Sequence, residues 1–377
     1  MNTFDWEYYI NYYPDLRPAG VDTKEKAWIH YIIHGKKEGR LCAKKEERVY
    51  IKDINPYIRE ERVYVKKEPM REKVKIEQPL IIVASKVINL SETLYMPEIS
   101  NDLFYSCNTS IICKKEENVG TYVLNVRYVN YRKEEYAPLK CYTLNKCIIL
   151  DTSFNKISEK IFKYSTLELE SKNNIGFEDI KLFNYNNIVY FIGNHVKERT
   201  CSIVTGKYNI SEYYVLDSLN GNILQSLHTA AIEKNWCYFE NDGNLQLVYS
   251  WYPIKICKII NNKLILDKII TCNDFISLRG STNGCKYKDE TWFITHINKD
   301  GGNYLHRFVI FNKNTLRYSN YFKFENFKVE FCLGLIISET DFIISYSLHD
   351  QQSKIMIIPI INILSIPFVN FPISIII

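Results

Sequence analysis

The sequence has no strong excess of charge of either sign, and it contains little glycine, proline or paired cysteine. Its 48 Lys and Arg residues against 43 Asp and Glu leave a net charge of +5, far from the strongly basic profile of nucleic-acid-binding proteins. The 14 glycines and 11 prolines among 377 residues exclude collagen-like and low-complexity chains. None of the 11 cysteines forms a C-x-x-C pair, which argues against a zinc ribbon and a small disulfide-bonded scaffold. We therefore expect no metal, no cofactor and no nucleic-acid partner.

The N-terminal segment lacks the basic and then apolar pattern of a secretory signal. MNTFDWEYYI contains acidic and aromatic residues instead. The odd number of scattered cysteines indicates reduced thiols rather than a disulfide framework. These features favour a cytoplasmic location, which would be the host-cell cytoplasm if the protein is viral.

The C-terminal segment has no charged residue after Lys354, over 23 residues. That is the length of a membrane span. Pro359, Pro367 and Pro372 interrupt the stretch, and proline breaks the hydrogen bonding of a helix. We expect buried β-structure from Ile355 to Ile366, followed by a packed terminal extension and no membrane partner. A membrane tail anchor is the alternative that the length leaves open.

Two zones of different composition precede the bulk of the chain. Residues 1–41 show helical spacing of Trp28, Tyr31 and Ile32, with Thr23 as a candidate N-cap, which predicts a small helical module. Residues 42–78 are dense in Lys, Arg and Glu and have too little apolar content for a core. We expect a charged linker or extended arm there, because its interleaved glutamates disfavour binding to an anionic partner.

From residue 79 to 377 the sequence pattern changes to short apolar or alternating runs separated by Asn, Asp, Gly and Lys. Examples are PLIIVAS, TYVLNVRYVNY, KCIILDTS, NLQLVYSWYP and FIISYSL. Their length and their β-branched and aromatic content are typical of strands, and no helical stretch intervenes. About 300 residues of antiparallel strands fit five four-stranded blades of about 60 residues each. The predicted fold class is mainly β, a five-bladed β-propeller, with a pair of β-sandwiches as the competitor.

Polar residues interrupt several of these strands. If the blades are arranged radially, polar groups at the inner ends of strands converge on a central channel. Taken one by one, each has an ordinary structural explanation: Arg127 could extend from a sheet face, and His296 could be a core histidine. Trp236, Trp251 and Tyr252 could stack on sugar rings or pack between blades.

One series of motifs resembles a known family. In chain order these are FEDIKLF, EKNW, RGSTNG and a WFITH strand, followed by FCLGLIISETDFIISYSLHD. The series resembles five-bladed β-propeller mannoside phosphorylases (glycoside hydrolase family 130) and β-1,2-mannosyltransferases. The N-terminal FDWEYY and HGKKEGR segments resemble a helical unit found beside glycosyltransferase domains of bacteria and giant viruses.

The resemblance implies a glycan-active enzyme, a glycosyltransferase or glycoside phosphorylase acting on mannose-type sugars. Asp179 matches the family's proton donor and would be the general acid. A carbohydrate would be the partner, and the donor is left open between a sugar phosphate and a nucleotide sugar. The resemblance implies phosphate contacts for Lys181, Arg279 and His296. It implies sugar contacts for Asn125, Arg127, Glu178, Lys234, Asn235, Trp236, Tyr346 and Asp350.

The chemistry of these residue types is consistent with that expectation. Glycosyl transfer passes through an oxocarbenium-like state, so one side of the bond needs an acid and the other a positioned nucleophile. Where an anion is the nucleophile, cationic donors replace the second carboxylate. The family's E-D-P-R motif reads Glu178-Asp179-Ile180-Lys181 here, and Lys does not clamp an oxyanion as Arg does. This departure leaves open a transferase or a non-catalytic propeller that binds carbohydrate or protein.

Overall fold

The computed structural model describes residues 5–35, 38, 40, 78–116, 119–131, 140–211, 214–215, 217–227, 232–299, 302–312 and 315–372. The chain divides into two compact units, Met1–Lys73 and Val74–Ile377. The predicted linker over 42–78 lies outside the described residues except for its last position. Its boundaries, and those of the two flanking zones, stay predictions.

The N-terminal unit contains two short helices, as the spacing predicts. They are α1 (Trp6–Tyr12) and α2 (Lys24–His30), and a π-helical turn, η1 (Tyr31–Gly35), follows α2. Thr23 is confirmed as the N-cap of α2, because its hydroxyl accepts a hydrogen bond from the Lys26 backbone N–H at 3.3 Å. The apolar face differs from the prediction: α2 buries Ala27, whereas Trp28 is half-exposed.

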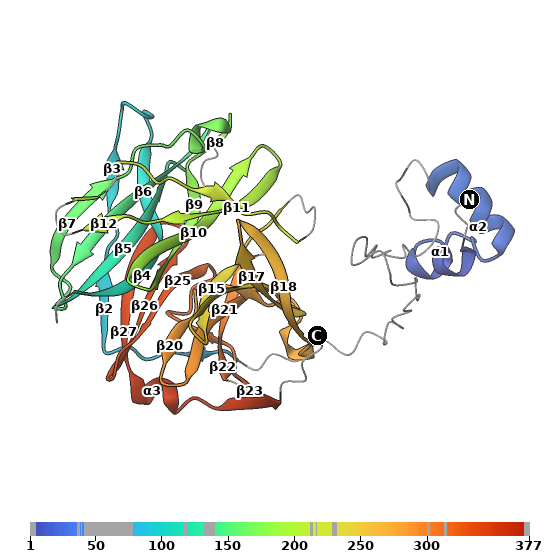
Figure 1. The fold of residues 1–377 in the computed structure, drawn as a ribbon. Coiled ribbons are helices and arrows are strands. Elements are labelled where there is room, and N and C mark those ends of the chain that lie inside the picture. The colour runs from blue at the N-terminus through green and yellow to red at the C-terminus, as the bar shows by residue number, and fades with distance from the viewer. Residues whose placement is uncertain are drawn as a thin grey trace. The chain divides into compact units, whose positions relative to one another are not determined.

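The second unit is mainly β, and its strands form five sheets of four or more strands within the described residues (Figure 1). The first contains β3 (Thr93–Tyr95), β4 (Leu103–Glu116), β5 (Val119–Val129), β6 (Cys141–Leu150), β7 (Lys156–Ile161) and β8 (Asn174–Ile175). The second contains β9 (Phe177–Tyr185), β10 (Ile188–Lys197), β11 (Thr200–Lys207) and β14 (Asn222–Ile223). The third contains β15 (Cys237–Asn241), β16 (Asn244–Trp251), β17 (Ile254–Ile260) and β18 (Lys263–Ile270).

The last two sheets include strands from both ends of this unit. The fourth contains β1 (Leu80–Ile81), β19 (Arg279–Gly280), β20 (Cys285–Tyr287), β21 (Glu290–Lys299), β22 (Asn303–Asn312), β23 (Thr315–Ser319), β24 (Phe322–Lys323) and β28 (Phe368–Pro372). The fifth contains β2 (Lys86–Asn89), β25 (Glu330–Ile337), β26 (Asp341–Leu348) and β27 (Gln352–Pro359). The smaller elements are β12 (Ile210–Ser211), β13 (Tyr214–Val215), η2 (Glu168–Glu170), η3 (Asn273–Phe275) and α3 (Ile360–Leu364).

The hydrophobic core is divided into clusters that each join two successive sheets. One of them packs Phe104 of the first sheet against Ile343 and Ile355 of the fifth, which closes the ring. Successive residues of a strand serve different clusters: Trp292 faces the fifth sheet and Phe293 the third. Because each sheet packs against a neighbouring sheet on both of its faces, its strands contain continuous apolar runs. The mainly β class and the propeller-like arrangement are thus confirmed. The number of blades stays a prediction, because the fourth sheet mixes strands from several parts of the chain.

Strands β4, β9 and β25 contact one another, and β15 contacts β9; we call these four the inner strands. Each lies at or near one edge of its sheet, so the backbone N–H and C=O groups on its unpaired side need other hydrogen-bond partners. On β9, the Leu182 N–H donates to the Ser110 hydroxyl at 2.8 Å, and the Leu182 carbonyl accepts from the Asn283 amide at 3.0 Å. Polar side chains thus connect the inner strands across the gaps between sheets.

The C-terminal expectation is only partly right. Strand β27 ends at Pro359, and residues 360–364 form α3 instead of continuing the predicted β-structure. Proline has no backbone N–H for a sheet ladder and favours a helix start, which explains the change. The terminal extension is packed as expected, because β28 pairs antiparallel with β23. In the part of the chain that the structure describes, every helix is too short or too polar to cross a membrane.

Candidate active site

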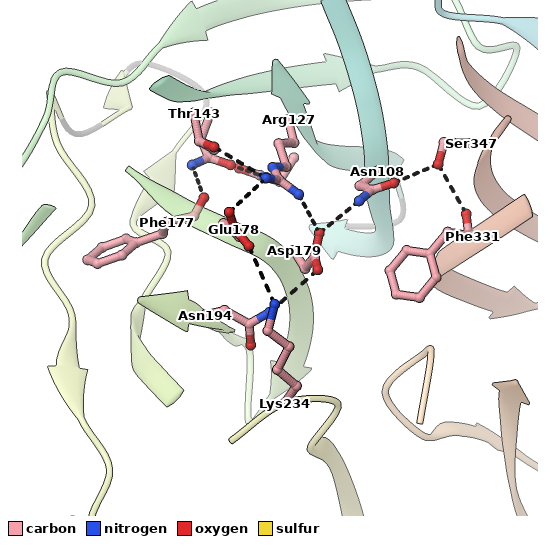
Figure 2. A network of polar contacts seen from close by, with 12 residues as sticks. Asn108, Arg127, Thr143, Phe177, Glu178, Asp179, Asn194, Lys234, Phe331 and Ser347 are labelled. Atoms are coloured by element: carbon pink, nitrogen blue, oxygen red, sulfur yellow. Dashed lines mark hydrogen bonds and ion pairs between the residues drawn. The ribbon is translucent and has the colours of Figure 1, made fainter. Parts of the chain in front are cut away.

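Two adjacent carboxylates and one guanidinium form the centre of the candidate site (Figure 2). Arg127 on β5 places Nη1 2.8 Å from Asp179 Oδ1 and Nη2 3.2 Å from Glu178 Oε1. The same Nη2 donates to the Tyr131 hydroxyl at 3.1 Å and to the Thr143 hydroxyl at 3.4 Å. The Arg127 side chain is almost completely buried, so its charge depends on these two acids for compensation.

The backbone of β9 explains how both acids reach one guanidinium. Neighbouring strand residues normally point to opposite faces, but β9 has a bulge here, with Asp179 and Ile180 opposite the single residue Gly193. Asp179 adopts a left-handed φ of +50°, which redirects its side chain. Strands β4 and β25 have matching bulges, at Asn108 and Leu333.

Two asparagines complete the contacts of Asp179. The Asn108 amide donates to Asp179 Oδ1 at 2.8 Å and is itself fixed by the Ser347 hydroxyl, which donates to Asn108 Oδ1 at 2.6 Å. The Asn194 amide approaches Asp179 Oδ2 at 3.4 Å. Sequence analysis missed both asparagines. Their signal was a single amide residue inside a predicted strand, in SCNTSII and FIGNHV.

Burial and charge act on Asp179 in opposite directions. Burial of the carboxyl would raise its pKa, but Arg127, Asn108 and Lys234 together outweigh burial and hold the pKa below its ordinary value. Asp179 is therefore a carboxylate at neutral pH in the free protein. An acid role requires that it take up a proton before it can donate one.

The EKNW segment lies beside this centre. Lys234, whose side chain is 39% exposed, places Nζ 3.8 Å from Glu178 Oε2. Asn235 has a left-handed φ of +67° and lines a cavity shared with Asp179. The Trp236 ring is buried against Tyr249, with ring centroids 4.9 Å apart. Lys234 and Asn235 thus lie at the site, whereas the ring of Trp236 belongs to the core.

Of the three residues expected to bind phosphate, only Lys181 lines the same cavity, and the His296 ring packs against Phe331, which also lines it. Lys181 is buried and donates to the Trp236 carbonyl; its Nζ is 3.7 Å from Cys237 Sγ. His296 is buried with Nδ1 2.8 Å from the Ser281 hydroxyl. Burial, aided by the charges of His306, Arg279 and Lys181, holds the pKa of His296 well below its usual value, so its imidazole is neutral. Arg279 is exposed and pairs with His296 across the β19–β21 ladder.

The other expected sugar-contacting residues lie at different depths. Asn125 is fully buried and donates to Asn145 at 2.9 Å, and Asn145 donates to the Phe177 carbonyl at 2.9 Å. Asn125 therefore supports the start of β9 rather than facing the cavity. The pKa of Cys107 on β4 is raised by burial and further by the charge of Asp350. Asp350 therefore lies near β4.

The aromatic candidates lie away from the acids. Tyr346 is fully buried in the core between the fourth and fifth sheets, and its hydroxyl donates to Glu325. Trp251 packs against Phe293 at a centroid distance of 5.2 Å, so packing between sheets is the better explanation for it. Tyr252 is exposed on the turn between β16 and β17.

The cavity beside Asp179 has a volume of only about 10 Å³, which is room for one water. Any ligand larger than a water molecule would therefore bind on the solvent side of Glu178, Asp179 and Lys234, whose side chains are partly exposed. Among the described residues, no three His, Cys, Asp or Glu side chains are grouped as metal ligands would be.

Neither a protein-family model nor a curated protein sequence matches the chain. Solved structures do match its fold. A candidate glycoside hydrolase from Parabacteroides distasonis has a TM-score of 0.50 at 8% identity, over 76% of this chain and 95% of that one. A β-1,2-mannobiose phosphorylase from Listeria innocua has a TM-score of 0.49 at 12% identity, over 69% and 91%. A structure from glycoside hydrolase family 130 has a TM-score of 0.48 at 9% identity, over 74% and 91%. At 8% identity, the similarity to the Parabacteroides distasonis structure shows a shared fold and nothing more. None of these three similarities supports the resemblance of the N-terminal helical module.

Proposed function

We propose that the chain is a glycan-active enzyme that transfers a mannose-type sugar, with Asp179 as the general acid. The observation that supports this most directly is the shared guanidinium. Glu178 and Asp179 both bind Arg127, so they lie on one side of any sugar bound above them. A hydrolase with two catalytic carboxylates needs them on opposite sides of the scissile bond. The nucleophile must therefore come from elsewhere.

Two cations, Lys181 in the cavity and Arg279 near it, suit an anionic nucleophile or leaving group. Lys181 lines the cavity, and the charges of both act on the neutral His296. Lys181 has a backbone carbonyl and a thiol, but no carboxylate, among its hydrogen-bond partners in the described residues. A phosphate or sugar-phosphate group would place its charge against these two cations. This favours transfer to or from a sugar phosphate, with a nucleotide sugar as the second type of donor.

One panel of reactions tests the proposal. The full chain is incubated with mannose 1-phosphate or nucleotide sugars together with short mannosides, and separately with mannosides and inorganic phosphate. We expect lengthened mannosides with release of phosphate or nucleotide, or sugar 1-phosphate in the reverse reaction, measured by mass spectrometry and a phosphate assay. Absence of any product from proteins that still bind the mannosides would contradict an enzymatic role.

The pKa of Asp179 predicts the pH dependence of that activity. A general acid must be protonated to act, and the pKa of Asp179 lies below the ordinary Asp value of about 3.9. Above that pKa the protonated fraction of Asp179 falls up to tenfold per pH unit. We therefore expect kcat/KM, which reports the free enzyme, to fall as pH rises from 5 to 7. A flat or rising profile over this range would mean that Asp179 acts as a carboxylate and not as the acid.

A second function is favoured by two observations. The cavity beside Asp179 holds about one water, and Lys181 stands where the resembled family has arginine. A propeller that binds carbohydrate without turning it over would need only the partly exposed groups. Such a protein would bind mannosides in a titration that Lys234→Met weakens, and it would fail throughout the panel above.

A further inference from the structure

Two hydrogen bonds connect Asp179 to a strand from a distant part of the chain (Figure 2). Asn108 is the extra residue in the bulge of β4, and Ser347 lies on β26 of the fifth sheet. The Asn108 amide donates to Asp179 Oδ1 at 2.8 Å, and the Ser347 hydroxyl donates to Asn108 Oδ1 at 2.6 Å. Because the first and fifth sheets close the ring, these bonds link Asp179 to the closure.

The chemistry of the three groups fixes the direction of both bonds. A carboxylate only accepts hydrogen bonds, so the NH2 group of Asn108 must face Asp179 and the amide oxygen must face away from it. The side chains of Asn108 and Ser347 are buried, and a buried amide oxygen without a partner is costly. The Ser347 hydroxyl supplies that partner. Its other acceptor, the Phe331 carbonyl, is 3.5 Å away and forms the weaker bond.

Asn108 depends on this support because strand pairing does not hold its backbone. Cys107 and Thr109 each have a partner on β5, whereas Asn108 between them has none. Its φ of +31° is a value that few residues other than glycine adopt. The bonds of the Asn108 side chain therefore do for this residue what the ladder does for its neighbours.

We propose that Ser347 is a positioning residue of the candidate site, which holds the Asn108 amide against Asp179 from the fifth sheet. The amide then fixes one oxygen of the carboxylate and favours the charged form of the group. The effect of Ser347 on catalysis rests on the proposed function, whereas its effect on Asp179 itself does not.

The charged side chains near Asp179 are separate from this connection. They are Arg127 of β5, Lys234 ahead of β15, Glu178 of β9, and Asp350, whose charge acts with that of Asp179 on the thiol of Cys107. Both hydrogen bonds of the Ser347 hydroxyl go to uncharged acceptors. Replacing Ser347 by alanine therefore changes the support of Asn108 without removing a charge.

The pKa of Asp179 is measured by 13C NMR titration of the full chain, labelled at the carboxyl carbons of aspartate. The signal of Asp179 is the one that Asp179→Asn lacks. We expect Ser347→Ala to raise this pKa by about half a pH unit to one pH unit. A hydrogen bond to a charged group is worth about one to two pH units, and an unsupported amide keeps only part of it.

Ser345→Ala is a matched control on the same strand. Ser345 is as fully buried as Ser347, and its hydroxyl also donates to β4 at 2.6 Å, but the acceptor is the backbone carbonyl of Thr109. This variant therefore loses a similar hydrogen bond between the same two strands without touching Asn108. It should leave the pKa of Asp179 unchanged.

A double-mutant cycle tests whether Ser347 acts through Asn108. Asn108→Gly removes the amide and suits the left-handed backbone at this position. In that background, Ser347→Ala should have no further effect on the pKa of Asp179. If acid unfolds the chain before the titration ends, the onset of the signal change still ranks the variants, because a higher pKa moves the onset to a higher pH.

Three results would each overturn the proposal: a pKa of Asp179 that Ser347→Ala leaves unchanged, an equal rise in Ser345→Ala, or a full effect of Ser347→Ala in the Asn108→Gly background. On the substrate that the reaction panel identifies, kcat should fall by about tenfold in Ser347→Ala and stay unchanged in Ser345→Ala, since a misplaced reacting group slows the chemistry. The titration itself needs no substrate. A shifted pKa in a chain without turnover would therefore contradict the proposed function and support the positioning role.

Discussion

Asp179→Asn is expected to lower turnover by about 10²–10⁴-fold on whichever substrate the panel identifies. The amide keeps the size of the side chain and one oxygen that can accept from Asn108, although its NH2 group cannot accept from Asn194. It has no acidic proton to deliver to a leaving oxygen, and the expected loss is the range that general acid catalysis supplies. Turnover is measured at the pH of highest kcat/KM. Unchanged turnover would remove Asp179 from the mechanism.

A matched control is available elsewhere in the ring. Asp267 on β18 is 17% exposed, against 19% for Asp179, and its carboxylate pairs with Lys258 at 2.6 Å. Asp267→Asn therefore removes an ion-paired carboxylate of similar burial that lies outside the site. Its turnover should match the wild type. The melting temperature of Asp179→Asn should stay within a few degrees of the wild type, since Glu178 still compensates Arg127.

Arg127→Met is expected to have the largest effect on stability, a loss of about 3–5 kcal/mol in the free energy of unfolding. Removing one partner of a buried ion pair leaves the other charge uncompensated, and here two carboxylates would face each other without the guanidinium. The loss is measured by urea unfolding at pH 7. Activity should be lost as well, because Arg127 holds Asp179 in place.

A variant with compensating changes separates charge from packing. Arg127→Met combined with Glu178→Gln and Asp179→Asn leaves no unpaired carboxylate, so it should recover more than half of the lost stability. If the triple variant is as unstable as Arg127→Met alone, the loss comes from the hydrogen bonds to Tyr131 and Thr143 and not from charge.

Sequence patterns were sufficient for the class of fold, whereas the candidate site came from the resemblance and the roles of its residues stay predictions. Short apolar runs with β-branched and aromatic residues predicted the strands, because those side chains fill a sheet that is buried on both faces. Arg127 and Asp179 are 52 residues apart in the chain, yet both were expected at the site, and their side chains meet at 2.8 Å. Each stands as a charged residue inside a strand.

The remaining contacts depend on features that residue types do not encode. Asn108 reaches Asp179 because β4 has an extra residue at that point, and a bulge leaves no clear trace in a single sequence. Tyr346 shows the converse. Its place in a strand resembling the last blade suggested a sugar contact, whereas the side chain points between sheets and binds Glu325. Which face of a strand looks toward the centre depends on register, which one residue reverses.

The bulges at Asn108, Asp179 and Leu333 also bear on how such a protein changes over evolution. An extra residue stands outside the ladder of paired backbone groups, so a substitution there leaves the strand pairing of the sheet in place. Because Asn108 contacts Asp179 and Leu333 lines the cavity beside it, changes at these two positions would alter the surroundings of Asp179 while the scaffold persists. This separation is consistent with a shared architecture at 8% sequence identity.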